Sequence, residues 1–491
     1  MKRSPSSTLL PAAALLALAW ALPSAALAQR SGPQPRNIVF ILSDDHRHDF
    51  MGFHPGAPEF LETPALDRLA AEGAHVRNAF VTTSLCSPSR ASILTGQYAY
   101  EHGVVDNSRM IREGAVFFPE LLQKAGYHTA FIGKWHMGGH TDDRQPGFDR
   151  WVSFPGQGVY VDPVLNIDGE RAPLKGYITD LLTDYAIDYL KGRDGKKPFA
   201  LYLSHKAVHA EFVPAPRHRG RYAEVELKLP ETMAFTEENY EGRPRWVREQ
   251  RFGWHGVDHM YHGQMSFDTF YRRYAETLLA LDESVGRVID QLEKSGLAKN
   301  TLVIYMGDNG FSFGEHGLID KRHAYEESIR VPMVAWAPGL IPRGSTVDPI
   351  VLNVDIAPTL LDLAGVSRPD WMDGRSFLPL LEGKRVEGWR ESFVYIYYWD
   401  YNFPHTPTVY ALRDDRYKYM FYHGLWDKNE LYDLQKDPIE KQNLIDVPEH
   451  RERVEAMKTR LFDALEAAGA VDVKFDRPLY GQQDERKLNV H

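Results

Sequence analysis

The chain contains a single cysteine, Cys86, among its 491 residues. One thiol cannot form an intramolecular disulfide, so in an oxidising compartment the ordinary role of Cys86 is that of a small buried hydrophobe. Internal repeats and low-complexity tracts are also missing from the sequence. With 43% hydrophobic and 12% aromatic residues, the composition instead fits one large globular core with an appendage.

An excess of positive charge and a long apolar run are both missing as well. The formal net charge is -10, which argues against broad binding of nucleic acid or of an anionic membrane. The apolar run at residues 9–22 is too short for a comfortable membrane span, and no cysteine after it could carry a lipid anchor. Lys2 and Arg3 precede this run, and Ala26-Leu27-Ala28 follows it. We therefore expect a signal peptide over residues 1–28 and a soluble periplasmic or secreted product without a membrane anchor.

Strands and helices alternate over most of the remaining chain. A helix is predicted to begin at Thr63-Pro64 and to stop at Gly73, and a longer helix is predicted over about 271–297. Short apolar runs between the helical segments predict strands at 37–42, 128–132, 199–203, 301–306 and 334–336. This alternation predicts an α/β domain over residues 29–381, with a large, mostly parallel sheet sandwiched by helices.

After about Leu381 the pattern changes to aromatic-rich strands, predicted at 392–398, 409–413 and 417–422, and a helix at about 448–468. We therefore expect residues 382–491 to form a small antiparallel α+β subdomain that contributes to a substrate pocket. The segment between His205 and the long helix is rich in proline and aromatic residues, and a long irregular segment inside an enzyme domain is often a substrate loop.

Polar side chains follow four of the predicted strands. They are Asp44-Asp45, Lys134-Trp135-His136, His205 and Asp308-Asn309. Ligands of open α/β sheets bind at the carboxyl ends of the strands, so we expect these groups to converge on one site although they are far apart in the sequence.

The two acidic pairs indicate a metal site. Adjacent carboxylates at the end of a buried strand are costly unless a cation or ordered donors compensate them. Asp44, Asp45, Asp308 and Asn309 offer only oxygen ligands, which favours calcium or magnesium over zinc. The alternative for Asp44-Asp45 is a helix N-cap next to a solvated acid.

Cys86 lies in a distinctive motif, Cys86-Ser87-Pro88-Ser89-Arg90, which continues as Ala91-Ser92-Ile93-Leu94-Thr95-Gly96. Pro88 suits the first turn of a helix, whose positive end would then point at the reacting centre. The motif resembles the signature of type I sulfatases, and three further segments resemble that family: Gly133 to Gly138, the stretch around Lys321, and Glu430 to Leu434. The alternative for Arg90 is a surface salt bridge. Glu326 and Arg330, spaced four apart, are expected to form an ordinary helix ion pair.

The resemblance implies an alkaline phosphatase-like sulfatase fold and the hydrolysis of a sulfate ester. It implies that a formylglycine-generating enzyme oxidises Cys86 to formylglycine, whose hydrate attacks sulfur. The metal that the resemblance implies is calcium, which would be bound by Asp44, Asp45, Asp308, Asn309 and the modified Cys86. Lys134, Lys321 and Arg90 would hold the developing negative charge, and His136 would take a proton from the second hydroxyl. His205 would protonate the leaving oxygen, although His209 lies close to it in the sequence.

The segments 44–47 and 145–158, together with Asn166, are similar to bacterial N-acetylglucosamine-6-sulfatases, which act on sulfated glycans such as heparan, mucin or keratan. Trp399, Asp400, His405 and Arg413 could line a sugar pocket, since aromatic faces and bidentate polar groups suit pyranose rings; packing within the subdomain and ordinary surface exposure are the alternatives. Four other functions stay open: an arylsulfatase, a choline-sulfatase-like enzyme, a phosphonate or phosphodiester hydrolase, and a catalytically silent glycan-binding protein.

Overall fold

The computed structural model describes residues 36–138, 141–193, 197–263 and 265–471. The expected signal peptide therefore lies outside the described residues. Within the described ranges, no helix combines the length and the apolar character that crossing a bilayer requires.

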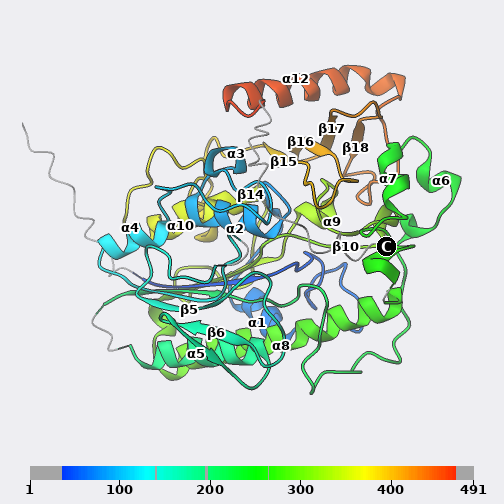
Figure 1. Cartoon of the computed structure of the whole chain (residues 1–491). Helices are drawn as coiled ribbons and strands as arrows, with labels where there is room; N and C mark the ends of the chain where they lie inside the picture. The colour runs from blue at the N-terminus through cyan, green and yellow to red at the C-terminus, as the bar shows by residue number, and fades with distance from the viewer. Residues whose placement is uncertain (1–35, 139–140, 194–196, 264, 472–491) are drawn as a thin grey trace, which may run out of the picture. The chain divides into compact units, whose positions relative to one another are not determined.

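A ten-stranded mixed sheet forms the centre of the domain (Figure 1). Its five middle strands are parallel: β9 (Thr301–Gly307), β1 (Asn37–Ser43), β8 (Phe199–Ser204), β4 (His128–Lys134) and β5 (Arg150–Phe154). One side continues through β12 (Met333–Trp336), β2 (Ala74–Val76) and β13 (Ser345–Val347), and the other through β6 (Val164–Ile167) and β7 (Glu170–Pro173). The five strands predicted from apolar runs are all present, and four of them are the parallel neighbours β9, β1, β8 and β4.

Helices cover both faces of this sheet because its strands alternate their side chains between two cores. In β1, Ile38, Phe40 and Leu42 join one core, and Val39 and Ile41 join the other. The helices α1 (Pro64–Glu72), α5 (Ile178–Lys191) and α8 (Phe267–Lys294) lie on the second face, and α2 (Cys86–Thr95), α4 (Phe118–Lys124) and α10 (Ile356–Leu363) lie on the first (Figure 1).

The predicted long helix, α8, begins four residues earlier than expected. Its N-cap is Ser266, whose hydroxyl accepts a hydrogen bond from the backbone N–H of Thr269 at 3.3 Å. The serine satisfies one of the free N–H groups of the first turn and thereby fixes the start of the helix.

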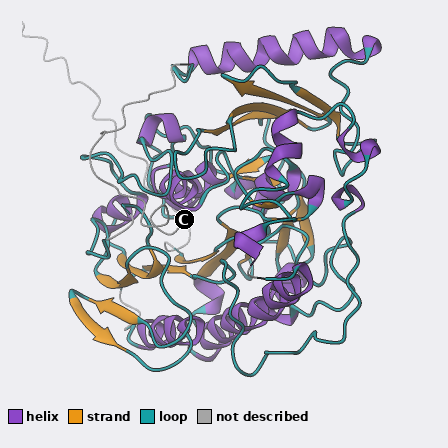
Figure 2. Ribbon diagram, turned by 45° about the vertical axis from the view of Figure 1, so that its right-hand side comes forward, coloured by secondary structure: helices purple, strands orange, loops and turns teal. Residues whose placement is uncertain are grey.

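The C-terminal part contains a four-stranded antiparallel sheet of β15 (Ser392–Tyr397), β16 (Thr408–Asp414), β17 (Tyr417–His423) and β18 (Glu430–Asp433). Helix α12 (Arg451–Ala467) lies along one face of this sheet (Figure 2). The other face joins a core with residues of the larger part: Phe393, Tyr395 and Tyr397 of β15 belong to this core, and Ile396 belongs to the core under α12. The antiparallel subdomain is confirmed, and its boundary at residue 382 stays a prediction.

Several further short strands and α-helices lie within the described residues. They are β3 (Ala79–Phe80), α3 (Ala99–His102), α6 (Glu237–Tyr240), α7 (Arg245–Gln250), β10 (Ser312–Phe313), β11 (Ile319–Asp320), α9 (Glu326–Ile329), β14 (Val351–Leu352) and α11 (Leu378–Leu381).

Buried ion pairs join helix α9 to the C-terminal sheet. Glu326 of α9 contacts Arg413 of β16 at 3.2 Å and Lys418 of β17 at 3.1 Å. The expected helix ion pair between Glu326 and Arg330 is therefore wrong: α9 is a single turn that ends at Ile329, and the carboxylate of Glu326 points into the C-terminal sheet. These cations hold the pKa of Glu326 well below its usual range, although burial acts in the opposite direction.

Candidate active site

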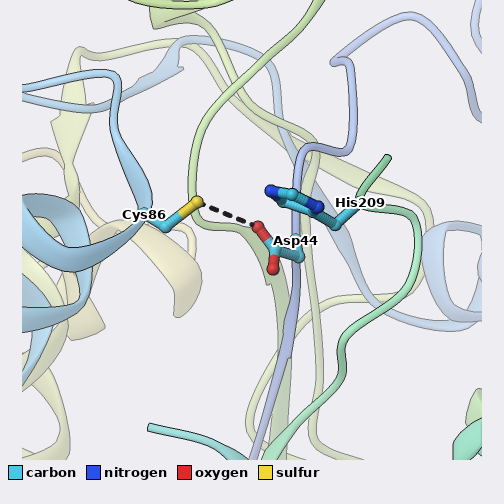
Figure 3. Close-up of side chains that lie close together, drawn as sticks. All are labelled: Asp44, Cys86 and His209. Atoms are coloured by element: carbon cyan, nitrogen blue, oxygen red, sulfur yellow. Dashed lines mark hydrogen bonds between the residues drawn. The ribbon is translucent and has the colours of Figure 1, made fainter. Parts of the chain in front are cut away.

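The carboxyl ends of the parallel strands place the predicted polar residues at one edge of the sheet. Asp44 and Asp45 follow β1, and Asp308 and Asn309 follow β9, its hydrogen-bonded neighbour. All four side chains are buried. Cys86 is the first residue of α2 and is buried as well, and its Sγ lies 3.3 Å from Oδ1 of Asp44 (Figure 3). The sequence thus identified a real cluster of side chains.

The acidic groups have the arrangement of a cation site. One oxygen each of Asp44, Asp45 and Asp308 lies within 4.8 Å of the others. Oδ2 of Asp45 and Oδ1 of Asn309 are buried without a hydrogen-bond partner among the described residues. Burial raises the pKa of Asp45 and brings that of Asp308 to about 7, because the neighbouring carboxylates add to the cost of ionising either group. Oxygen donors that repel one another and lack partners fit a hard divalent cation.

Three cations surround these carboxylates. Arg90 donates from Nε to Oδ2 of Asp308 at 2.9 Å and from a terminal nitrogen to the carbonyl of Lys134 at 2.7 Å. The ammonium of Lys134 contacts Asp44, and that of Lys321 contacts Asp45. Arg90 is therefore not part of a surface salt bridge. Burial would raise the pKa of Asp44, yet Lys134 and the other nearby cations hold it well below its usual range.

The thiol of Cys86 is poorly suited to act as a nucleophile itself. Burial raises its pKa, and the charge of Asp44 adds to the effect. Nζ of Lys321 lies only 3.4 Å from Sγ but does not overcome these effects. A protonated thiol at the centre of an oxyanion-binding cluster is what we expect of a precursor that is modified before use.

The structure corrects the choice of histidine. Successive residues of a strand point to opposite faces, and His205, directly after β8, is directed to the face covered by α8, where its Nε2 lies 3.0 Å from the hydroxyl of Ser284. His209 lies instead beside Asp44 and Cys86, and its Nε2 is 3.8 Å from Oδ2 of Asp45 (Figure 3). The histidine of this cluster is therefore His209, which sequence reasoning had noted only as an ambiguity.

His136 is held at the start of α2. Its Nδ1 lies 3.4 Å from the hydroxyl of Ser87, and that hydroxyl also donates to the carbonyl of His136. Burial and then the charge of Lys134 place the pKa of His136 well below its usual range, so the imidazole is neutral. Its role as a proton acceptor stays a prediction.

The predicted sugar-contacting residues fall into two groups. Trp399, Asp400 and His405 lie on the segment between β15 and β16, where the backbone N–H of Asn402 donates to Asp400 at 2.9 Å. Arg413 is different: it is buried, paired with Glu326, and its guanidinium carbon lies 4.4 Å from the ring centroid of Phe80. Its expected place in a sugar pocket is wrong because these contacts use it in the junction between the sheets.

Two further side chains reach the cluster. Oε1 of Gln157 accepts a hydrogen bond from Nζ of Lys134 at 2.5 Å. Lys206 is buried with its Nζ 4.7 Å from the ring centroid of Tyr160, and burial lowers its pKa to about 8. The Gly-Gln-Gly sequence at 156–158 was a visible signal for Gln157, whereas Lys206 had no signal beyond its place between the two histidines.

A buried cysteine at a helix start, a carboxylate cluster and three facing cations define a hydrolase that binds a tetrahedral anion. Residues 36–366 match the family model described as Sulfatase, and residues 314–467 match that of the N-sulphoglucosamine sulphohydrolase C-terminal region. The chain belongs to the sulfatase family and is a sulfuric ester hydrolase. Dependence on formylglycine and on a metal is general in this family.

Similar proteins carry a consistent description. The N-acetylglucosamine-6-O-sulfatase of Bacteroides thetaiotaomicron is 35% identical, over 92% of this chain and 89% of that protein. The human N-acetylglucosamine-6-sulfatase is 31% identical over 75% of this chain and 68% of its own length. A solved structure of a protein in complex with its substrate D-glucosamine-2-N,6-O-disulfate has a TM-score of 0.82 and 32% identity, and the match covers 91% of this chain and all of that one.

Proposed function

We propose that this protein hydrolyses the 6-sulfate ester of N-acetylglucosamine in a sulfated glycan, with Cys86 converted to formylglycine and calcium as the metal. The observation that carries the proposal is the convergence of Cys86 with Asp44, Asp45 and Asp308 at one sheet edge. The glycan is supported by the relatives, which are described as N-acetylglucosamine-6-sulfatases, and by the glucosamine disulfate bound in the similar structure.

Formylglycine supplies a hydrated aldehyde whose hydroxyl can attack sulfur, and calcium supplies positive charge for the sulfuryl oxygens. Asp44, Asp45, Asp308 and Asn309 would hold the ion, since their oxygens are the donors that calcium prefers and two of them lack a partner. The guanidinium of Arg90 keeps Asp308 in place through two nitrogens, with N–O distances of 2.9 and 2.8 Å.

The remaining residues provide charge and proton transfer. Lys134 and Lys321 approach from different segments and can release their carboxylates to bind sulfuryl oxygens. Nδ1 of His209 lies 2.5 Å from the carbonyl of Ala210, an acceptor, so Nδ1 carries a proton and Nε2 faces the reacting centre. Burial, and then the charge of Lys134, hold the pKa of His209 well below its usual range, so a proton added to its Nε2 is readily given to the leaving alcohol. His136 would take the proton of the second hydroxyl.

The cellular setting belongs to the same proposal. A cleavable segment at residues 1–28 would deliver the protein to the periplasm or outside the cell, and a formylglycine-generating enzyme would have to act on Cys86. Export is tested by the N-terminal sequence of the protein recovered from the periplasm or the medium, which should begin near Gln29.

The function is tested by measuring sulfate release by matured protein from N-acetylglucosamine 6-sulfate, galactose 6-sulfate and an aryl sulfate in parallel. We expect the first to give the highest kcat/KM. Activity confined to the aryl ester would reject the sugar assignment and keep the sulfatase chemistry. Silence on all three esters in protein that carries an aldehyde at position 86 would reject the proposal.

A further inference from the structure

A second group of buried polar side chains lies beside Lys321 and has no role in the chemistry described above. Asp320 and Arg322 flank this lysine, and both have left-handed backbone conformations, with φ of 72° and 85°. Residues other than glycine adopt such conformations at an energetic cost, and they concentrate where a site must hold a side chain in place. The backbone here turns sharply on both sides of the lysine that contacts Cys86.

Arg322 is held by two partners, Asp320 and Phe403, and His255 contacts both of them. A terminal nitrogen donates to Oδ1 of Asp320 at 2.8 Å, and Oδ2 of Asp320 lies 3.3 Å from Nε2 of His255. The guanidinium carbon lies 3.8 Å from the ring centroid of Phe403, and that ring also stacks on His255 with centroids 4.7 Å apart. Phe403 belongs to the segment between β15 and β16, so the C-terminal part covers this arginine.

One hydrogen-bond donor of this arrangement is unused. Nε of Arg322 is buried and has no partner among the described residues. A buried donor without an acceptor costs about as much as a lost hydrogen bond, and a charged donor costs more. Arg322 directly follows Lys321, whose Nζ lies 3.4 Å from Sγ of Cys86, so its backbone lies beside the reacting centre.

The phenol of Tyr397, at the end of β15, supplies a second unused group. Its hydroxyl is buried without a partner among the described residues. The segment of Arg322 lies close to this strand, because the hydroxyl of Ser84 contacts both the carbonyl of His323 at 3.3 Å and the phenol of Tyr395. Tyr395, two residues earlier on the same face of the strand, has its hydroxyl 2.6 Å from that of Ser84. On the same face of β15, the hydroxyl of Tyr395 therefore has a partner and that of Tyr397 has none among the described residues.

We propose that Arg322 and Tyr397 bind an oxygen of the alcohol part of the substrate, next to the ester that is cleaved, and thereby select a polyhydroxylated leaving group. Nε–H of Arg322 can only donate, and the phenol can donate or accept, so together they fit a sugar hydroxyl or a carbonyl oxygen. This inference rests on the proposed function, because it requires a sugar sulfate as substrate.

The test compares Tyr397→Phe and Arg322→Lys with Tyr398→Phe as the matched control. Tyr398 is the next residue, but it belongs to the core under α12 on the opposite face of the sheet. For each variant, kcat and KM are measured with N-acetylglucosamine 6-sulfate, and inhibition constants are measured for the two products, inorganic sulfate and N-acetylglucosamine. Inorganic sulfate reports on the sulfate site alone, and the free sugar reports on the alcohol site.

We expect Tyr397→Phe to raise KM and the inhibition constant of the sugar about threefold to tenfold, the effect of one neutral hydrogen bond, and Arg322→Lys to raise them about tenfold to a hundredfold. The inhibition constant of sulfate should stay unchanged in both variants, and the control should change neither constant.

Two results would overturn the inference while leaving the proposed function intact. One is wild-type behaviour of both variants, and the other is an equal rise of the two inhibition constants, which would indicate a structural role. Failure of the wild-type protein to hydrolyse the sugar sulfate would overturn the proposed function, and the inference with it.

Discussion

Replacing His209 by alanine should remove the proton donor of the leaving group and leave the rest of the site in place. The Nε2 atom of His209 lies 3.8 Å from Asp45, whereas its Nδ1 is held by the Ala210 carbonyl. A sugar alkoxide is a poor leaving group, so loss of a general acid should lower kcat on N-acetylglucosamine 6-sulfate by about 10²- to 10⁴-fold. An aryl sulfate releases a stable phenolate and should lose much less.

The matched variant is His205→Ala, because this histidine lies four residues earlier and faces α8. The substitution removes the 3.0 Å hydrogen bond between His205 and the hydroxyl of Ser284. That hydroxyl keeps its second partner, the hydroxyl of Thr183, at 2.6 Å. A lost neutral hydrogen bond and a small cavity together should cost about 2–4 kcal/mol of the free energy of unfolding. We expect a lower Tm and nearly unchanged kcat.

Both variants are assayed with the sugar sulfate and with an aryl sulfate, and their Tm values are measured on the same preparations. The reasoning is refuted if His205→Ala loses activity selectively on the sugar ester while His209→Ala keeps it. Selective loss in His209→Ala at an unchanged Tm would establish the assignment made from the structure.

Three further predictions follow. A Cβ on Gly133 would lie 1.7 Å from the carbonyl oxygen of Ser204, and this residue has a φ of 127°, so Gly133→Ala should give little soluble enzyme. The control is Gly169→Ala, whose Cβ would meet open space and which should express normally despite its own positive φ. Equal yields and Tm values of the two variants would contradict this prediction. Burial raises the pKa of Asp282 from 3.8 to about 7, so the folded protein binds the proton more tightly than the unfolded chain does. As the pH rises from about 4 to about 7, the wild-type protein should therefore lose about 1.4 kcal/mol of its free energy of unfolding per pH unit relative to Asp282→Asn, measured by denaturant unfolding. A pH-independent difference would count against the shift. Calcium at a hundred times its Kd should raise the free energy of unfolding by about 2.7 kcal/mol. The variant Asn309→Ala should require more calcium for the same rise in Tm. Absence of any effect of calcium on Tm would argue against the site.

The sheet and the position of the site followed from the sequence because both depend on local patterns. The parallel strands β1, β4, β8 and β9 are short apolar runs, and the groups that follow them must lie at one edge once the strands are parallel. The start of α2 at Cys86 likewise follows from Pro88 in its first turn. These inferences needed no knowledge of distant contacts.

The errors arose where distant segments decide the direction of a side chain. Nothing in the sequence distinguishes the roles of His205 and His209. Only the folded structure shows that His205 points toward α8, where it contacts Ser284, and away from Cys86. Glu326 pairs with Arg413, 87 positions away in the chain, rather than with the residue one helical turn ahead. Such pairings depend on how the C-terminal sheet packs, which composition and spacing do not specify.

The central claim is that Cys86 is the precursor of the nucleophile. The most direct measurement is the mass of the tryptic peptide 78–90 from protein produced with and without a formylglycine-generating enzyme, with sulfate release from N-acetylglucosamine 6-sulfate measured on the same samples. We predict that activity rises in proportion to the fraction of peptide carrying an aldehyde at position 86 and that Cys86→Ala has none. Full activity in protein whose peptide carries only the thiol would contradict the account.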